Sequence, residues 1–408
     1  MPAPVMPPPS TPSRLSAGAL AALPTVRRIA VLRPNAIGDF VFALPALHAL
    51  RASWPQARIT LLGREWHREL LTGRPGPVDE VVVVPAMPGI GAPEDTPPDT
   101  PRTDDFLRAV RQARFDLAIQ LYGGGRYTNP FVASLGAALT VGMQADDAPP
   151  LDRNLPYERW RNERLRLLEV VGLAGATPRE LNPRLAVTAQ DHAVLNDATA
   201  LPHQPIVVLQ PGATDERRRW PVERFAAVGR ALAEAGAFLV INGSEAERPL
   251  TAQLASMLAV PHVDLAGRLP LAGLLALLQR ARLLVSNDTG PLHLASALGC
   301  PSVGIYWAMN IITAAPLVQG RQRAILSMRL MCPVCGVENV RQRCPHQVSF
   351  VDDVGVDEVQ VAAMAEWHAG PGGHTAPAPH ARHDTTRAGA TPAAGAELLD
   401  AQGVADQT

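Results

Sequence analysis

Residues 28–62 read RIAVLRPNAIGDFVFALPALHALRASWPQARITLL and decide the fold class of this chain. The short apolar run Arg28–Arg33 predicts a buried strand. After the loop Pro34–Asp39, apolar residues near Phe40–Ser53 predict an amphipathic helix, and Arg58–Leu62 predicts a second strand. A strand, a helix and a second strand in this order predict a βαβ unit, the building block of a parallel sheet.

The same alternation continues along the 408 residues and starts afresh at residues 205–210, PIVVLQ. A chain of this length predicts two or three domains. We expect an α/β fold of two Rossmann-like domains, with ligands bound at the carboxyl ends of strands on either side of a cleft. The predicted segments are a disordered leader at 1–24, a first domain at 25–175, an interdomain linker region at 176–204, a second domain at 205–355, a C-terminal helix at 356–369 and a disordered tail at 370–408.

The composition excludes several classes of function. All 37 basic residues are Arg and none is Lys, so a lysine Schiff base and a Walker-A lysine are excluded. The 37 basic and 38 acidic side chains leave a formal net charge of −1, which argues against a nucleic-acid binder held by bulk electrostatics. The pattern G-x-G-x-x-G is absent, so a nicotinamide cofactor is not indicated.

Several features favour a cytoplasmic protein. Four Cys in 408 residues are no disulfide framework and favour a reducing compartment. No apolar run reaches the roughly 18 residues that span a bilayer. Residues 1–24 are too rich in Pro and too weakly apolar for a signal peptide.

Two loops that follow predicted strands carry a carboxylate. Asp39 lies at the mouth of the first predicted helix, where an Asp is either an N-cap or a general base pointing into the cleft. Asp288-Thr289-Gly290-Pro291-Leu292-His293 also follows a predicted strand, and Pro291 fits a helix start. The free N–H groups of that helix would hold a phosphate. The alternative is that Asp288 caps the helix and His293 is a core histidine.

Two further loops in the second half of the chain suit a nucleotide. Gly212–Pro221 holds three consecutive Arg, which either lie solvated on the surface or bind a diphosphate with their forked donors. A carboxylate at Glu247 or Glu245, beyond the next strand, either accepts hydrogen bonds from ribose hydroxyls or only complements the helix dipole. No Asp-x-Asp pair is present to hold a divalent ion, so Arg and a helix dipole take its place.

A Cys/His cluster stands near the end of the second domain. Cys332-Pro-Val-Cys335 precedes Cys344-Pro-His346, and this spacing permits a Cys₃His structural zinc site. The alternative is a set of reduced loop thiols.

These loops, in this order, resemble glycosyltransferase family 9, the ADP-heptose:lipopolysaccharide heptosyltransferases. The resemblance spans roughly Arg27 to His368. It is carried by RIAVLRPNAIGDFVFALPALHALRASWPQARIT, VVLQPGATDERRRWPVERFAAVGRAL, LVINGSEAERPL and VSNDTGPLHLASALGCPSVGIY.

The resemblance implies a GT-B fold, with the acceptor in the first domain and an ADP-heptose-like nucleotide-sugar donor in the second. It implies an inverting transfer that requires no metal cofactor, onto a lipid-linked or other glycan of the lipopolysaccharide type. A protein with such an acceptor is expected at the inner face of the inner membrane, with peripheral membrane contact. By motif, the implied roles are Asp39 as general base, Thr214 and Arg218 on the donor phosphates, Glu247 on the ribose, Asp288 facing the transferred sugar, Thr289 and Gly290 as the phosphate-binding turn and His293 as its support.

Two other functions remain compatible with the sequence. One is a non-catalytic nucleotide-sugar-binding protein on the same fold, and the other is a GT-B-like nucleotide-sugar epimerase that needs no acceptor.

Overall fold

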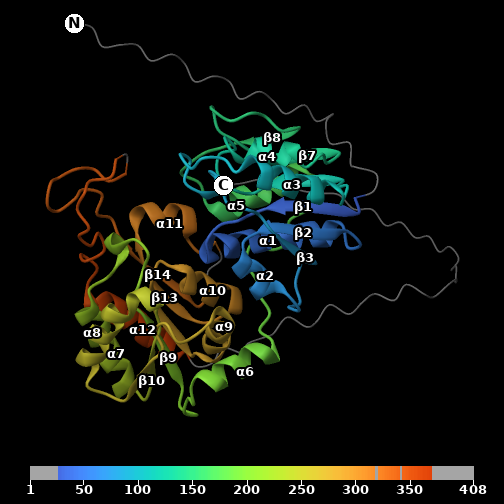
Figure 1. The fold of residues 1–408 in the computed structure, drawn as a ribbon. Helices are drawn as coiled ribbons and strands as arrows, with labels where there is room; N and C mark the ends of the chain where they lie inside the picture. Colours follow the sequence, from blue (N-terminus) through green and yellow to red (C-terminus); the bar gives the residue numbers. More distant parts are fainter. Residues whose placement is uncertain (1–25, 318–319, 341, 370–408) are drawn as a thin grey trace, which may run out of the picture. The chain divides into compact units, whose positions relative to one another are not determined.

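A computed structural model describes residues 26–317, 320–340 and 342–369 (Figure 1). The predicted leader and tail lie outside the described residues. Two six-stranded parallel sheets organise the chain. The first is built from β1 (Arg28–Leu32), β2 (Arg58–Gly63), β3 (Glu80–Val83), β6 (Leu117–Gln120), β7 (Leu139–Gln144) and β8 (Arg153–Pro156). The second is built from β9 (Ile206–Gln210), β10 (Phe238–Ile241), β11 (His262–Asp264), β12 (Leu283–Asn287), β13 (Ser302–Trp307) and β14 (Gln322–Ser327).

Both sheets have the same strand order. The first runs β3-β2-β1-β6-β7-β8 and the second β11-β10-β9-β12-β13-β14. In each sheet the chain first moves to one side and then returns past its first strand, which is the doubly wound Rossmann order. The order reverses between β1 and β6 and between β9 and β12, and ligands of such sheets bind at this switch point. The predicted α/β fold is confirmed.

Helices connect the strands, as a parallel sheet requires. In the first half of the chain they are α1 (Ile37–Ser53), α2 (Glu65–Leu71), α3 (Thr100–Arg111), α4 (Thr128–Ser134), α5 (Glu163–Leu173) and α6 (Ala189–Ala198). In the second half they are α7 (Val222–Glu234), α8 (Arg248–Leu258), α9 (Leu271–Arg280), α10 (Gly290–Leu298), α11 (Ala308–Ala314) and α12 (Val356–His368), with short 3₁₀ turns η1 (Glu216–Arg218) and η2 (Glu245–Glu247). The pair β4 (Met87–Pro88) and β5 (Gly91–Ala92) stands apart. Every described helix is too short or too polar to cross a lipid bilayer.

Helix α1 differs from its prediction in two ways. It begins at Ile37 after the N-cap Ala36, three residues earlier than predicted, so Asp39 lies in its first turn and does not cap it. The expected amphipathic pattern is also wrong, because ten of its residues from Phe40 to Leu50 are buried. The reason is that α1 packs against both α5 and α10, so its flanks are covered by helices from each half of the chain (Figure 1).

The two halves share part of their hydrophobic core. One cluster of buried residues includes Ile29 and Leu47 from the first half and Leu277 and Leu294 from the second. The described residues accordingly fall in one compact unit. The segment predicted as a linker, 176–204, contains helix α6, because Thr188 and Asp191 cap its N-terminus reciprocally. The domain boundaries themselves stay predictions.

Candidate functional site

Asp39, the predicted base, lies beside a buried arginine at the end of β1. Arg33 directly follows β1, and its side chain is only 1% exposed, whereas that of Asp39 is 43% exposed. Arg33 Nη2 donates to the Asp39 carbonyl oxygen at 2.7 Å, and Nε donates to the same oxygen at 3.2 Å. The nearest Asp39 carboxylate oxygen, Oδ1, is 4.0 Å from Nη2. The guanidinium therefore holds the main chain of Asp39 and leaves its carboxylate toward solvent.

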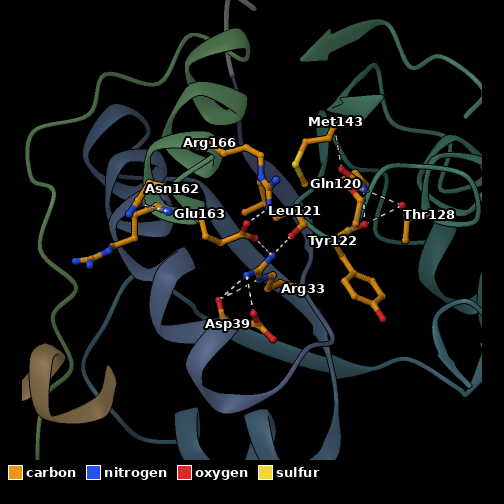
Figure 2. A network of polar contacts seen from close by, with 12 residues as sticks. Arg33, Asp39, Gln120, Leu121, Tyr122, Thr128, Met143, Asn162, Glu163 and Arg166 are labelled. Carbon is orange, nitrogen blue, oxygen red and sulfur yellow. Dashed lines mark hydrogen bonds and ion pairs between the residues drawn. The ribbon is translucent and has the colours of Figure 1, made fainter. Parts of the chain in front are cut away.

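A second acidic residue completes the surroundings of Arg33 (Figure 2). Arg33 Nη1 donates to Glu163 Oε1 at 3.0 Å and to the Leu121 carbonyl oxygen. Glu163 in turn pairs with Arg166 one turn along α5. Burial lowers the pKa of Arg33 to about 10, against the opposing charge of Asp39, so the guanidinium stays protonated at neutral pH. Arg33 follows β1 and Leu121 follows β6, so the hydrogen bond between these two residues bridges the switch point of the first sheet.

Asp288, the second predicted carboxylate, is buried at the switch point of the second sheet. It follows β12, and its side chain is 2% exposed. Asp288 Oδ1 lies 3.1 Å from His293 Nε2, and Oδ2 accepts a hydrogen bond from Arg218 Nη1 at 3.3 Å. Burial by itself raises the pKa of the carboxyl, but the hydrogen bond and charge of His293 and the charge of Arg218 outweigh it, so the pKa lies below its usual value. Thr289, not Asp288, is the N-cap of α10.

The three consecutive arginines after β9 have three different environments. Arg217 is buried, pairs with Asp215 at 2.6 Å and donates to Asn339 Oδ1 at 3.0 Å, so it is structural. Arg219 pairs with Glu216 at 2.9 Å on the outer side of the turn. Arg218 alone among the three reaches the Asp288 loop, at 3.2 Å from its carbonyl oxygen.

Thr214, the other predicted phosphate contact, is exposed one residue before Asp215, the N-cap of η1. It therefore lies on the same turn as Arg218, at the carboxyl end of β9.

Glu247 lies against Gly212, in the loop that precedes η1. Its Oε2 accepts a hydrogen bond from the Ser244 N–H at 2.8 Å, and a Cβ at position 212 would overlap its carboxylate. Only glycine at 212 permits this approach. The alternative Glu245 is exposed and pairs with Arg248 at 3.0 Å. Of the two carboxylates, Glu247 is therefore the one beside the loop Gly212–Pro221.

The first turns of α1 and α10 meet. An ideal Cβ at Gly38 would stand 2.8 Å from His293 Cδ2 and 3.8 Å from the Cα of Gly290, so only glycine allows this packing. The rings of Phe42 and His293 are 4.5 Å apart between centroids. The carboxylate-bearing turn of the first half and the predicted phosphate turn of the second half, Thr289–Gly290, are thus neighbours.

Sequence reasoning missed Arg33, Glu163 and Arg166. The available signal was weak, because Arg33 ended an apolar strand run and Glu163 and Arg166 lay in an ordinary helical pattern. Only the tertiary structure shows that residues separated by 130 positions share one ion pair.

The Cys/His cluster predicted from the sequence is assembled. The ligand atoms of Cys332, Cys335, Cys344 and His346 all lie within 4.8 Å of one another, and Cys332 Sγ is 3.7 Å from His346 Nδ1. A hydrogen bond from Asn339 lowers the pKa of the Cys344 thiol to about 6, which favours the thiolate that metals bind. This donor set could hold a metal ion.

Known proteins match both the sequence and the fold. The family model described as glycosyltransferase family 9 (heptosyltransferase) matches residues 104–342. Lipopolysaccharide heptosyltransferase 2 of Salmonella typhimurium is 27% identical over 299 residues, which cover 68% of this chain and 82% of that protein.

Two solved structures illustrate the likeness of fold. The Escherichia coli ADP-heptose lps heptosyltransferase II is 20% identical, with a TM-score of 0.67 over 84% of this chain and 99% of its own. TibC, an iron-containing dodecameric glycosyltransferase from enterotoxigenic E. coli H10407, is 15% identical, with a TM-score of 0.52 over 85% of this chain and 78% of its own. The predicted GT-B architecture is confirmed by such neighbours.

Proposed function

Because the chain belongs to glycosyltransferase family 9, the heptosyltransferase family, we propose that it moves a heptose from an ADP-heptose-type donor onto a lipopolysaccharide-type glycan, with inversion at the anomeric carbon. Its activity as a glycosyltransferase follows from this membership, and the donor, the acceptor and the residues that act on them are the proposal. The observation that carries it is the meeting of the Asp39 turn with the Thr289–Gly290 turn.

Asp39 acts as the general base. Its carboxylate is the exposed one of the two in the site and leaves an oxygen free to accept a proton. As the acceptor hydroxyl attacks the anomeric carbon, its proton passes to Asp39, the new carbon–oxygen bond forms, and the bond to the donor's terminal phosphate breaks.

The leaving diphosphate gathers negative charge on the opposite face of the sugar. Arg218 and the N-terminus of α10 at Thr289–Gly290 supply positive charge and N–H donors for it, and Thr214 contributes a hydroxyl. Asp288 holds Arg218 and His293 in place through contacts of 3.3 and 3.1 Å. These groups take over the task that a divalent cation performs in other transferases, so the transfer needs no cofactor.

Glu247 binds the ribose of the donor. Its Oε2 is engaged by Ser244, and the remaining acceptor positions of the carboxylate are available to the ribose hydroxyls beside Gly212. Residues 205–355 then hold the donor, and residues 25–175 hold the acceptor.

A lipid-linked acceptor places the enzyme in the cytoplasm at the inner face of the inner membrane, with peripheral contact to the bilayer. The lipid-linked acceptor is supported by the name of the Salmonella typhimurium relative, which specifies lipopolysaccharide.

Cys332, Cys335, Cys344 and His346 hold a structural zinc ion. Tetrahedral zinc requires donor atoms roughly 3.3–3.8 Å apart, since its bonds to sulfur and nitrogen are about 2.3 and 2.0 Å long. The 3.7 Å between Cys332 and His346 fits this geometry. The ion would fix the loop that carries Asn339, the partner of Arg217, and takes no part in the transfer. Elemental analysis of the purified protein tests this: one zinc per chain supports it, whereas iron, as in TibC, or no metal contradicts it.

The function is tested by incubating the protein with ADP-heptose and heptose-free lipopolysaccharide core. We expect a heptosylated core and one equivalent of ADP. ADP-heptose binding without any product would instead favour a non-catalytic binding protein, and conversion of the donor sugar without acceptor would favour an epimerase.

A further inference from the structure

Arg33 is one of the most completely buried charged groups in the described residues, and the reaction proposed above assigns it no role. A buried charge is costly unless it is paired and its hydrogen bonds are satisfied. The four side chains Arg33, Asp39, Glu163 and Arg166 meet this requirement as two cations and two anions, joined in a row (Figure 2). Asp39 is the exposed member of the row, and the other three side chains are at most 13% exposed.

The hydrogen bonds of Arg33 are directed at the backbone beside the base. Nε and Nη2 both donate to the carbonyl oxygen of Asp39, and Nη1 donates to the carbonyl oxygen of Leu121 and to the carboxylate of Glu163. The planar guanidinium thereby connects the end of β6 and the start of α5 to the first turn of α1. Arg33, Leu121 and Glu163, at the end of β1, the end of β6 and the start of α5, thus determine where Asp39 lies.

We propose that Arg33 is a positioning residue that fixes the first turn of α1, so that the Asp39 carboxylate is aimed at the acceptor hydroxyl. Glu163 holds the guanidinium in the required plane. The inference rests on the proposed role of Asp39 as base. Being buried, Arg33 touches neither substrate and acts through Asp39 alone.

Asp39 has to be held by Arg33 because the rate of proton transfer is sensitive to geometry. A base must lie within about 2.6–3.2 Å of the oxygen whose proton it removes, and a displacement of about 1 Å can cost on the order of 10²-fold in rate. The N-cap of α1 is Ala36, which has no side-chain cap bond, so the end of this helix lacks the usual means of fixing its first turn. Arg33 takes over that task.

The test is a double-mutant cycle on kcat with Arg33→Lys and Asp39→Asn. Lysine keeps the charge but loses the fork that holds two N–H groups on one carbonyl. We expect Arg33→Lys to lower kcat about 10- to 100-fold with the donor KM unchanged within about twofold. In the Asp39→Asn background the same substitution should lower kcat by less than about twofold, because the base it positions is already gone.

A matched control separates positioning from the loss of any buried arginine. The side chain of Arg74 is likewise only 5% exposed and makes a two-pronged ion pair with Asp191, at 2.6 and 2.8 Å, away from Asp39. Arg74→Lys should lower the melting temperature as Arg33→Lys does and leave kcat unchanged. If Arg33→Lys does not fold, the double variant Arg33→Met/Glu163→Gln removes both charges; it should fold, and its kcat should lie at least about tenfold below that of the unmodified enzyme.

The outcomes distinguish this inference from the proposed function. Full turnover by Asp39→Asn removes Asp39 as base. A loss of turnover in Asp39→Asn together with wild-type kcat in Arg33→Lys, or equal losses for Arg33→Lys in both backgrounds, overturns the positioning role and leaves the base in place.

Discussion

Asp39 and Asp288 each lie at the switch point of one of the two sheets, but they follow strands on opposite sides of it and differ in their surroundings. Each follows the strand that flanks a switch point, β1 in one sheet and β12 in the other, and each lies near the first turn of a helix. The Asp39 side chain is 43% exposed and 4.0 Å from its cation. That of Asp288 is 2% exposed, with His293 at 3.1 Å and Arg218 at 3.3 Å.

In the proposed function, the environment and not the residue type assigns the role of each carboxylate. Asp288 lies within 3.3 Å of two basic side chains and has a lowered pKa, so it is held as an anion and serves as an anchor. Asp39 is held through its main chain, so its carboxylate keeps free acceptor positions. One carboxylate is therefore suited to receive a proton, and the other to orient cations.

The strongest test of this contrast is Asp39→Asn. An amide cannot accept the proton, so we expect kcat to fall about 10²- to 10⁴-fold. Thermal stabilisation by the donor should persist, because the proposed donor-binding residues lie in the other half of the chain. The exposed Asp105→Asn on α3 is the control and should behave like the unmodified enzyme. Undiminished turnover in Asp39→Asn would abolish the distinction between the two carboxylates.

Arg218→Gln tests whether the anchored cation faces the leaving group. Removal of a group that stabilises developing charge typically costs about 10²–10³-fold in kcat. Arg219→Gln, one residue further and paired with Glu216, is the matched control and should retain activity. Similar losses in both variants would indicate a general effect of charge on this turn, and no specific role for Arg218.

The substitution Asp288→Asn tests the contrast through the pH dependence of the free energy of unfolding. Because the folded-state pKa of Asp288 is lowered, its ion pairs stabilise the protein above the unfolded pKa of about 3.9, and this contribution is lost as the pH falls through the folded value. At pH 7 we expect Asn to reduce the free energy of unfolding by about 1–3 kcal/mol. The difference in free energy of unfolding between the variant and the unmodified protein, measured by denaturant titration, should shrink as the pH falls below about 3.9. A difference independent of pH would contradict the ionised anchor.

Glu247→Gln and Glu245→Gln give the smallest expected effect. Loss of a charged hydrogen-bond acceptor for the ribose should raise the donor KM about tenfold and leave kcat nearly unchanged. Glu245, which pairs with Arg248 at the surface, should have little influence. Initial-rate measurements against donor concentration check this. A larger rise in donor KM for Glu245→Gln than for Glu247→Gln would assign ribose binding to Glu245.

The sequence allowed most of the fold to be predicted, because apolar runs of strand length alternate with helical patterns in both halves. It also placed Asp39, Arg218, Glu247 and Asp288 at strand ends, where parallel sheets bind ligands. It failed for α1, which is covered on several sides and carries no polar face to show its orientation. The run of three arginines by itself predicted one environment for all of them, and only the family resemblance singled out Arg218. In the structure their partners Asp215, Asp288 and Glu216 separate them.

The family motifs and the order of strands and loops are local properties, so the sequence by itself determined the fold class, the family and the set of candidate residues. Burial and ion-pair partners determine which carboxylate is anchored and which is free. Some of these partners are distant in the sequence, as Glu163 is from Arg33. Only the tertiary structure decides this burial and these partners, because it brings distant groups within hydrogen-bonding distance and excludes water from some of them. The free-energy cost of burying a charge depends on its neighbours in space.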